Sequence, residues 1–359
     1  MIKYKFTDKN KSDFERDLKK KVSEYFNSNN LSKKSNLFML FKSLFFFLFY
    51  ASVYIAILKI EFSNIWVLLL LSVLLGFGHA FSGMNIMHDF VHGTYKKNKI
   101  GEVLLNTFLL LIGVNSFIWR IEHNVIHHTY TNINGVDQDV NTLYIFRFSE
   151  IQPKKWIHKY QYLYAPFIYC FAIIDWQTSK DFLKLYRYYR DGYFKSKGEM
   201  ILMLIRLILE KVIFYLLLFV IPYYAFNQGW QTPALMLITM MLSSSFVIAL
   251  VFRLAHVVPC TSLSDSKESE VCKNWFIHQI ESSSNFANDN SLITFLTGGL
   301  NFQIEHHLFP DICHVHYPVI AKIVKEIANE NGIKYNSYCT VLDAVKAHFR
   351  LLKDMGVKS

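Results

Sequence analysis

Four long apolar stretches constrain the fold of this chain more than any other feature. They cover residues 36–60, 65–86, 200–226 and 233–252. A helix needs about 20 mostly apolar residues to cross the hydrocarbon core of a bilayer, and each stretch is that long. A buried helix of a large soluble protein is the alternative for any one stretch, but four in one chain favour membrane spans. The composition agrees, because 18% of the residues are charged against about 25% in ordinary globular domains.

The basic residues predict how these spans are oriented. The links at 61–64 and 227–232 contain no Lys or Arg, whereas the N-terminus, residues 95–190 and the C-terminal tail hold most of them. By the positive-inside rule, these three basic parts lie on the cytoplasmic side. The formal net charge of +10 then fits an anionic membrane face, and we expect no nucleic-acid partner.

These patterns predict an all-α integral membrane bundle of about four transmembrane helices, with a cytoplasmic helical cap. We expect a basic N-terminal segment at 1–35 and one membrane domain at 36–359, whose cap comprises 87–199 and 253–359.

Three further segments are apolar or amphipathic, but we do not expect them to cross the membrane. Two shorter apolar runs, 103–118 and 162–176, are expected to be interfacial or re-entrant helices, because the clusters described below require an even number of spans between them. The segment from Tyr317 onward is typical of an amphipathic soluble helix that ends near Gly332.

The histidines are concentrated in three short clusters. These are HDFVH at 88–92, HNVIHH at 123–128 and QIEHH at 303–307, while His256 follows the fourth apolar stretch. Residues four apart share one face of a helix, so we expect His88 to act with His92, and His123 with His127. Adjacent histidines point about 100° apart on a helix. An HH pair can therefore serve two neighbouring ions, which suggests a dinuclear centre.

The type and number of these side chains limit the metal. Imidazole suits iron, zinc, copper and nickel, but a structural zinc site needs only four ligands. Eight histidines with Gln303 could give two ions four or five ligands each. The sequence contains neither HExxH nor the Glu-x-x-His motif of soluble di-iron bundles. We therefore expect a shell made almost entirely of nitrogen ligands.

The three clusters and their surroundings resemble the membrane fatty-acid desaturase family. The resemblance extends from about the first apolar stretch to Pro318. It is carried by HDFVH at 88–92, HNVIHHTYTN at 123–132, GVDQDV at 135–140, HKYQYLYAP at 158–166, NWFIHQIESSSNFA at 274–287 and FQIEHHLFP at 302–310. It implies two non-haem iron ions on the cytoplasmic side of the membrane. The ligands that we expect are His88, His92, His123, His127, His128, His256, Gln303, His306 and His307. Asp89, Asn124, Asp137, Asp139 and His278 are expected to orient the imidazoles.

The resemblance also implies a reaction. Gln303 stands where many family members have histidine, and this variant is similar to the front-end group, which desaturates between an existing double bond and the carboxyl end. The expected enzyme uses oxygen to introduce a cis double bond into an acyl-lipid or acyl-CoA, such as delta-6 desaturation of a linoleoyl substrate, and oxygen is reduced to water. No haem-binding HPGG occurs, so a separate ferredoxin or cytochrome should supply electrons. The expected location is a bacterial inner membrane.

Two other functions remain open. A related di-iron hydroxylase or ketolase would insert oxygen instead of removing hydrogen. A non-catalytic metal-binding or transport protein is the second alternative, but transporters usually hold their ligands near the bilayer midplane between repeats. Here the clusters lie at one predicted interface and we find no repeat.

Overall fold

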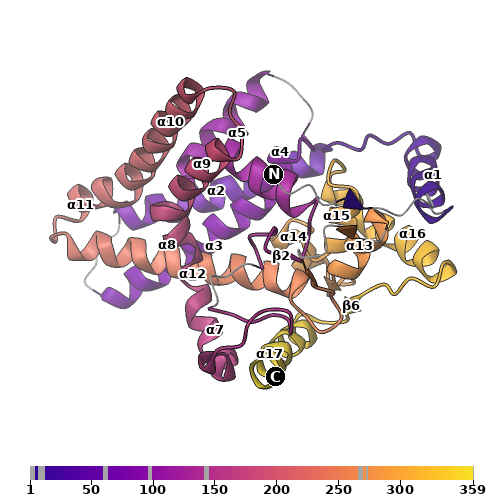
Figure 1. The fold of residues 1–359 in the computed structure, drawn as a ribbon. Helices are drawn as coiled ribbons and strands as arrows, with labels where there is room; N and C mark the ends of the chain where they lie inside the picture. Colours follow the sequence, from indigo (N-terminus) through magenta and orange to yellow (C-terminus); the bar gives the residue numbers. More distant parts are fainter. Residues whose placement is uncertain are drawn as a thin grey trace.

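The computed structural model describes residues 5–6, 13–59, 64–95, 99–140, 145–265, 270–271 and 274–358. This part of the chain is predominantly helical (Figure 1). Its strands form three parallel pairs of two residues each: β1 Lys5–Phe6 with β4 Glu270–Val271, β2 Ile133–Asn134 with β3 Ser264–Asp265, and β5 Asn285–Phe286 with β6 Ser337–Tyr338. The predicted helical class is therefore confirmed.

Three helices in the described part are long and apolar enough to cross a membrane. They are α2 Leu37–Lys59, the continuous helix Ile65–Val91 and α12 Gln231–His256. The continuous helix consists of α3 Ile65–Ser82, the π-helical turn η1 Gly83–Met87 and α4 His88–Val91. These helices correspond to three of the four predicted spans.

The fourth predicted stretch is also helical but is interrupted. It comprises α10 Lys197–Tyr215, the π-helical turn η5 Leu216–Val220 and α11 Ile221–Phe226. Two charged residues inside α10 are buried and paired. Glu210 accepts hydrogen bonds from Asn115 at 2.7 Å and Arg206 at 2.9 Å, and the ammonium of Lys211 lies 2.8 Å from Asp181 Oδ2. Pairing of this kind is the usual way to bury charge in an apolar setting.

Helices α3 and α12 pack in parallel, and this arrangement positions the metal-ligand candidates. Gly76 of α3 lies against Ser243, and His79 Nδ1 lies 2.8 Å from Ser244 Oγ. Because the two helices run in the same direction, both bring their C-terminal ends to one region. His88 and His256 stand at these two ends, although 168 positions separate them along the chain.

The close approach at Gly76 gives a testable prediction about this packing. A Cβ at residue 76 would clash with Ser243 Oγ and lie 2.5 Å from the backbone oxygen of Met240. We expect Gly76→Ala to lower the free energy of unfolding by about 1–3 kcal/mol, because an overpacked helix contact forces the backbone to shift. Gly198→Ala is the control, since its Cβ would come no nearer than 3.7 Å to Ser196 Oγ. Equal stability of the two variants in detergent unfolding would contradict the proposed contact.

The two shorter apolar runs form several short helices. The first becomes α5 Lys99–Leu111 and α6 Ser116–Arg120, and the second lies within α7 Gln161–Tyr169, α8 Ala172–Asp175 and the π-helical turn η4 Trp176–Lys180, which α9 Asp181–Arg190 follows. The 13 residues of α5 span about 20 Å, less than the roughly 30 Å of a hydrocarbon core. Gly113, with a φ of +68°, lies in the turn between α5 and α6.

The remaining helices gather at the end where α3 and α12 terminate. They are α1 Asp13–Ser28, η2 Ile121–His127, η3 Trp156–Tyr160, α13 Trp275–Ser282, α14 Ser291–Thr297, α15 Gln303–Leu308, η6 His314–His316, α16 Tyr317–Glu330 and α17 Val341–Val357. The predicted amphipathic helix from Tyr317 is thus α16, and Gly332 follows it with a φ of +67°.

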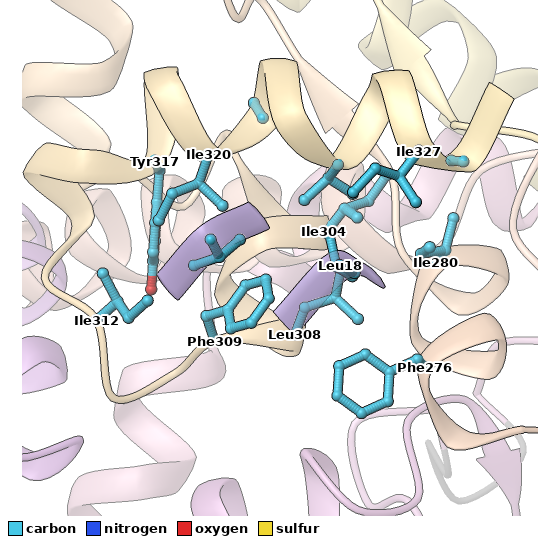
Figure 2. Packing of buried hydrophobic residues seen from close by; sticks show 14 of the residues in the cluster. Leu18, Phe276, Ile280, Ile304, Leu308, Phe309, Ile312, Tyr317, Ile320 and Ile327 are labelled. Atoms are coloured by element: carbon cyan, nitrogen blue, oxygen red, sulfur yellow. The ribbon is translucent and has the colours of Figure 1, made fainter. Parts of the chain in front are cut away.

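A hydrophobic core joins α1, α15 and α16. In Figure 2, Ile320 and Ile327 of α16 point toward Leu18 of α1 and toward Ile304 and Leu308 of α15. The apolar face of α1 repeats every four residues, at Phe14, Leu18, Val22 and Phe26, which are all buried. This core holds α15, and with it the third histidine cluster, against the rest of the cap.

Candidate metal centre

All three histidine clusters meet at the C-terminal ends of α3 and α12. The first cluster comes from α4, the second from the π-helix η2, and the third from α15, while His256 is the last residue of α12. The rings of His88 and His306, from the first and third clusters, lie 4.5 Å apart between centroids. The first and third clusters therefore lie at the same end of the helical bundle.

One group of imidazoles contains both histidines of the first cluster. The ligand nitrogens of His88, His92, His123 and His306 all lie within 4.8 Å of one another. His88 Nε2 is 3.2 Å from His123 Nε2, and His128 Nε2 is also 3.2 Å from His123 Nε2. His128 therefore lies directly beside this group of four.

A second group lies beside the first. It contains His127, His256 and His307, again with ligand nitrogens within 4.8 Å of one another. His307 Nε2 lies 3.2 Å from His256 Nε2. Gln303 places its side-chain nitrogen 2.9 Å from His256 Nε2 and 3.1 Å from His307 Nε2.

The adjacent histidines divide between the two groups. His306 belongs to the first group and its neighbour His307 to the second. The ring of His128 lies between them, with centroids 4.6 Å from His306 and 4.4 Å from His307. This arrangement suits two neighbouring ions, because each histidine of the adjacent pair can bind a different ion.

One predicted pairing differs in the structure. We expected His123 to act with His127, but the nitrogens of His127 group with His256 and His307. The cause is that η2 is a π-helix, in which the N–H of His128 donates to the carbonyl of His123, five residues earlier, at 3.0 Å. This wider turn brings His128 Nε2 to 3.2 Å from His123 Nε2, while the ring of His127 still stacks on that of His123 with centroids 5.2 Å apart. Such π-helical turns occur frequently at functional sites.

The geometry of the two groups fits metal ions. Two nitrogens bound at about 2.1 Å to one ion lie roughly 3.0–3.4 Å apart at the usual bond angles, and the 3.2 Å contacts above have this spacing. Within the described part of the chain, His92 Nε2, His127 Nε2 and His306 Nε2 are buried without a hydrogen-bond partner. Since buried polar atoms normally have partners, these nitrogens are suited to metal coordination.

The electrostatics of the site favour neutral ligands. Burial and the neighbouring imidazoles hold the pKa values of four residues well below the ordinary value, namely those of His123, His128, His306 and His307. Neutral imidazole is the form that binds metal. His127 differs, because the carboxylates of Asp137 and Asp139 outweigh burial, which lowers its pKa, and raise that pKa to about 9.

Two carboxylates contact the Nδ1 atom of His127. His127 Nδ1 lies 3.0 Å from Asp137 Oδ2 and 3.5 Å from Asp139 Oδ2. Asp137 Oδ2 also accepts a hydrogen bond from the backbone N–H of Asn132 at 2.8 Å. A carboxylate held in this way fixes the tautomer and the direction of a ligating histidine.

Three other residues were also expected to orient the imidazoles, and each makes a different kind of contact. Asp89 Oδ1 is 3.8 Å from His88 Nδ1. Asn124 donates to the backbone oxygen of Val91, at 3.1 Å, and so contacts the first cluster through its main chain. His278 Nε2 lies 2.8 Å from the backbone oxygen of Thr131, which belongs to the segment that follows the second cluster.

The sequence did not single out three residues that contact the imidazoles. Gln279 Oε1 lies 2.8 Å from His307 Nδ1, and Thr131 Oγ1 lies 3.1 Å from the same nitrogen. Tyr317 OH lies 3.3 Å from His306 Nδ1. Gln279 and Thr131 both lie inside the motifs that carry the family resemblance. Their polar side chains within these motifs were the one sequence feature that could have indicated a contact with the imidazoles.

A cavity of about 150 Å³ adjoins both groups of imidazoles. His123 and His256 line it together with apolar residues, among them Ile173, Ile248 and Phe252. Trp119, also in the wall, stacks on His123 with centroids 4.2 Å apart. Four charged side chains also line the cavity, Glu122, Asp139, Lys180 and Arg253, so its surface beside the candidate ligands is partly apolar and partly charged.

Comparisons with known proteins identify the family of this chain. The family model described as fatty acid desaturase matches residues 64–338. The chain is 32% identical to the sn-1 linoleoyl-lipid 6-desaturase of Arthrospira platensis, with 96% of this chain and 93% of that protein covered. It is also 32% identical to the protein of the same name from Synechocystis sp., with 99% and 98% covered. The acyl-lipid (8-3)-desaturase of Physcomitrium patens is 31% identical, with 98% and 73% covered. The resemblance carried by the histidine motifs is thus confirmed: the chain belongs to the fatty acid desaturase family, and it is an oxidoreductase of the desaturase kind.

Proposed function

We propose that this chain is a front-end acyl-lipid desaturase, which introduces a cis double bond into a linoleoyl chain on the carboxyl side of its existing double bonds. The observation that carries the proposal is the double group of imidazoles beside a cavity with an apolar wall from α12. The front-end position and the acyl-lipid carrier are supported by the relatives named linoleoyl-lipid 6-desaturases. The delta-6 position is the corresponding expectation for this chain.

The proposed cofactor is a pair of iron ions. His88, His92, His123, His128 and His306 would hold one ion, and the other would be held by His127, His256, Gln303 and His307. Gln303 is acceptable as a ligand because turning its amide by 180° presents the oxygen where the nitrogen now lies. When bound, the irons would supply the oxygen-dependent oxidation that removes two hydrogens from neighbouring methylene groups. Two more electrons and two protons are needed to reduce O2 to two waters, and we assign these electrons to a separate ferredoxin or cytochrome.

The residues around the irons would position the metal and the acyl chain. Asp137 and Gln279 hold His127 and His307 by Nδ1, which directs their Nε2 atoms inward. Apolar residues of α12, such as Ile248 and Phe252, would guide the acyl chain toward the imidazoles and keep water away from the reacting carbons. The chain would therefore select the carbon pair by position, while the irons supply the redox chemistry.

The membrane arrangement that we propose has four spans, with residues 200–226 as the third in chain order. The desaturase domain would cover 36–359 after a basic segment at 1–35, and its cap of 87–199 and 253–359 would face the cytoplasm. The excess of basic residues outside the predicted hairpin links supports this orientation. The proposed location is a bacterial inner membrane.

The cavity can be tested by filling it. Ala249 lines the cavity, and we expect Ala249→Phe to reduce desaturation of an 18-carbon chain by at least about tenfold, because specificity pockets discriminate sharply against lost space. Metal content should not change. Leu235→Phe is the matched control, since residue 235 lies on the same helix but is 37% exposed. Wild-type activity in Ala249→Phe would show that the acyl chain binds elsewhere.

The proposed reaction can be tested in cells that make no polyunsaturated lipid. The chain is expressed with linoleate supplied, and double-bond positions are mapped in lipid and in acyl-CoA fractions. We expect a new double bond on the carboxyl side, first in membrane lipid. A hydroxylated product would support the hydroxylase alternative instead, and unsaturation placed only in saturated chains would contradict the front-end proposal. Absence of any new product in cells containing metal-loaded protein would favour a non-catalytic metal-binding function.

A further inference from the structure

A buried lysine in the first membrane helix is connected to the candidate metal centre. Lys42 of α2 is 3% exposed. Its ammonium lies 2.8 Å from His314 Nε2 in η6, which is 272 residues later in the chain. Ionisable residues inside membrane helices are costly and usually have a functional partner. The contact between Lys42 and His314 therefore suggests a functional role for the pair.

The chemistry of the contact determines how His314 is protonated. An ammonium group can only donate hydrogen bonds, so His314 Nε2 must accept. The proton of the neutral ring then resides on Nδ1, which donates to Asp89 Oδ2 at 2.7 Å. A neutral imidazole thus joins the positive charge of Lys42 to the negative charge of Asp89. The two buried charges compensate one another through it.

Asp89 in turn faces one of the proposed iron ligands. Its other oxygen, Oδ1, lies 3.8 Å from His88 Nδ1. That nitrogen is buried and has no hydrogen-bond partner among the described residues. His88 Nε2 is on the opposite side of the ring, 3.2 Å from His123 Nε2. Ligating histidines typically donate this second N–H to a carboxylate, and Asp89 is the carboxylate in place to accept it.

We infer that Lys42 and His314 are positioning residues for the metal centre, and that they act by holding Asp89 toward His88. The series Lys42–His314–Asp89–His88 connects α2 to the first group of imidazoles. It accounts for the buried cation in α2 and for the tautomer of His314, and it places a carboxylate oxygen 3.8 Å from the buried Nδ1 of His88. The inference rests on the proposed metal centre, and it assigns a role to two residues outside the histidine clusters.

The inference is tested by measuring metal affinity in variants of His314. Purified full-length protein is titrated anaerobically with Fe(II) and, for its ligand-field spectrum, with Co(II). We expect His314→Leu to weaken metal binding by about 10–100-fold, the usual effect of losing an outer partner of a ligand, and to alter the Co(II) spectrum. His314→Gln should stay near the wild type, because a glutamine can accept from Lys42 and donate to Asp89. Lys42→Met should weaken binding in the same direction as His314→Leu.

A buried histidine outside the centre supplies the control. His348 contacts Tyr169 OH at 2.8 Å and the backbone oxygen of Val257 at 2.6 Å. His348→Leu should lower the unfolding temperature of the protein without changing metal affinity. Unchanged affinity in His314→Leu or Lys42→Met, or an equal loss in His348→Leu, would overturn the inference. If the wild type itself bound no metal, the proposed metal centre would fail instead, so the two failures are distinguishable.

Discussion

His128→Ala is expected to abolish desaturation and to weaken metal binding at the first group of imidazoles, the group to which His128 is assigned. His128 lies between the groups, with its Nε2 3.2 Å from His123 Nε2 and its ring 4.4 Å from that of His307. Losing a ligand should cost more than losing one of its hydrogen-bond partners, so we expect at least about a 100-fold loss of product. The measurements are the fatty-acid profile of expressing cells and the iron content of the purified variant.

A histidine-to-alanine change outside the metal groups is the control that distinguishes loss of metal binding from loss of stability. His348→Ala removes a buried imidazole that has two hydrogen-bond partners but lies outside the metal groups. It should retain iron and produce the same unsaturated product, even if it is less stable. A His128→Ala protein that kept wild-type iron and activity would contradict the assignment of His128.

Lys211→Met is expected to give the largest loss of stability among the substitutions considered. The ammonium of Lys211 is buried and contacts Asp181 Oδ2 at 2.8 Å, Gln177 Oε1 at 2.9 Å and the backbone oxygen of Gly113 at 3.0 Å. Methionine preserves much of the side-chain volume but leaves the carboxylate buried without its cation. Breaking a buried pair from one side costs about 3–5 kcal/mol, which denaturant unfolding in detergent would measure.

Two further variants show whether the uncompensated charge is the cause. Lys19→Met removes a lysine that lies 2.7 Å from Glu15 but is 55% exposed, and it should cost less than about 1 kcal/mol. The double variant Lys211→Met/Asp181→Leu should be more stable than Lys211→Met alone, since it removes the stranded carboxylate. If Lys211→Met were no more harmful than Lys19→Met, the buried pair would not contribute to the fold as described.

Periodicity and hydropathy predicted the parts of the fold that depend on local sequence. The stretches at 36–60, 65–86 and 233–252 became the three helices long enough to cross a membrane. Each contains an unbroken apolar run, so the local sequence is enough to predict the helix without knowledge of tertiary contacts. The stretch at 200–226 is harder to classify, because Glu210 and Lys211 become acceptable only through partners on other helices.

The candidate site was predictable in its residue types but not in its internal arrangement. Helical spacing correctly brought His88 together with His92, since α4 provides an ordinary helical turn there. The same rule assumed a regular helix at His123, where the chain forms a π-helix that places His128 Nε2 3.2 Å from His123 Nε2. No local pattern distinguishes these two helix types, so His128 could not be assigned to His123 in advance.

Residues that act across long sequence separations were also beyond local prediction. Gln279 contacts His307 from α13, and Lys42 contacts His314 from α2. Each contact depends on the packing of α2, α13 and α15 around the ends of α3 and α12. A lysine in an apolar stretch signals that some partner exists, but only the fold identifies that partner.

The most direct test of the account is the iron content of the purified wild-type chain. Protein reconstituted anaerobically with Fe(II) and freed of loosely bound metal would be assayed by elemental analysis and Mössbauer spectroscopy. The account predicts two irons per chain in nitrogen-rich surroundings. A chain that retained no iron, or a single tetrahedral zinc in its place, would contradict it.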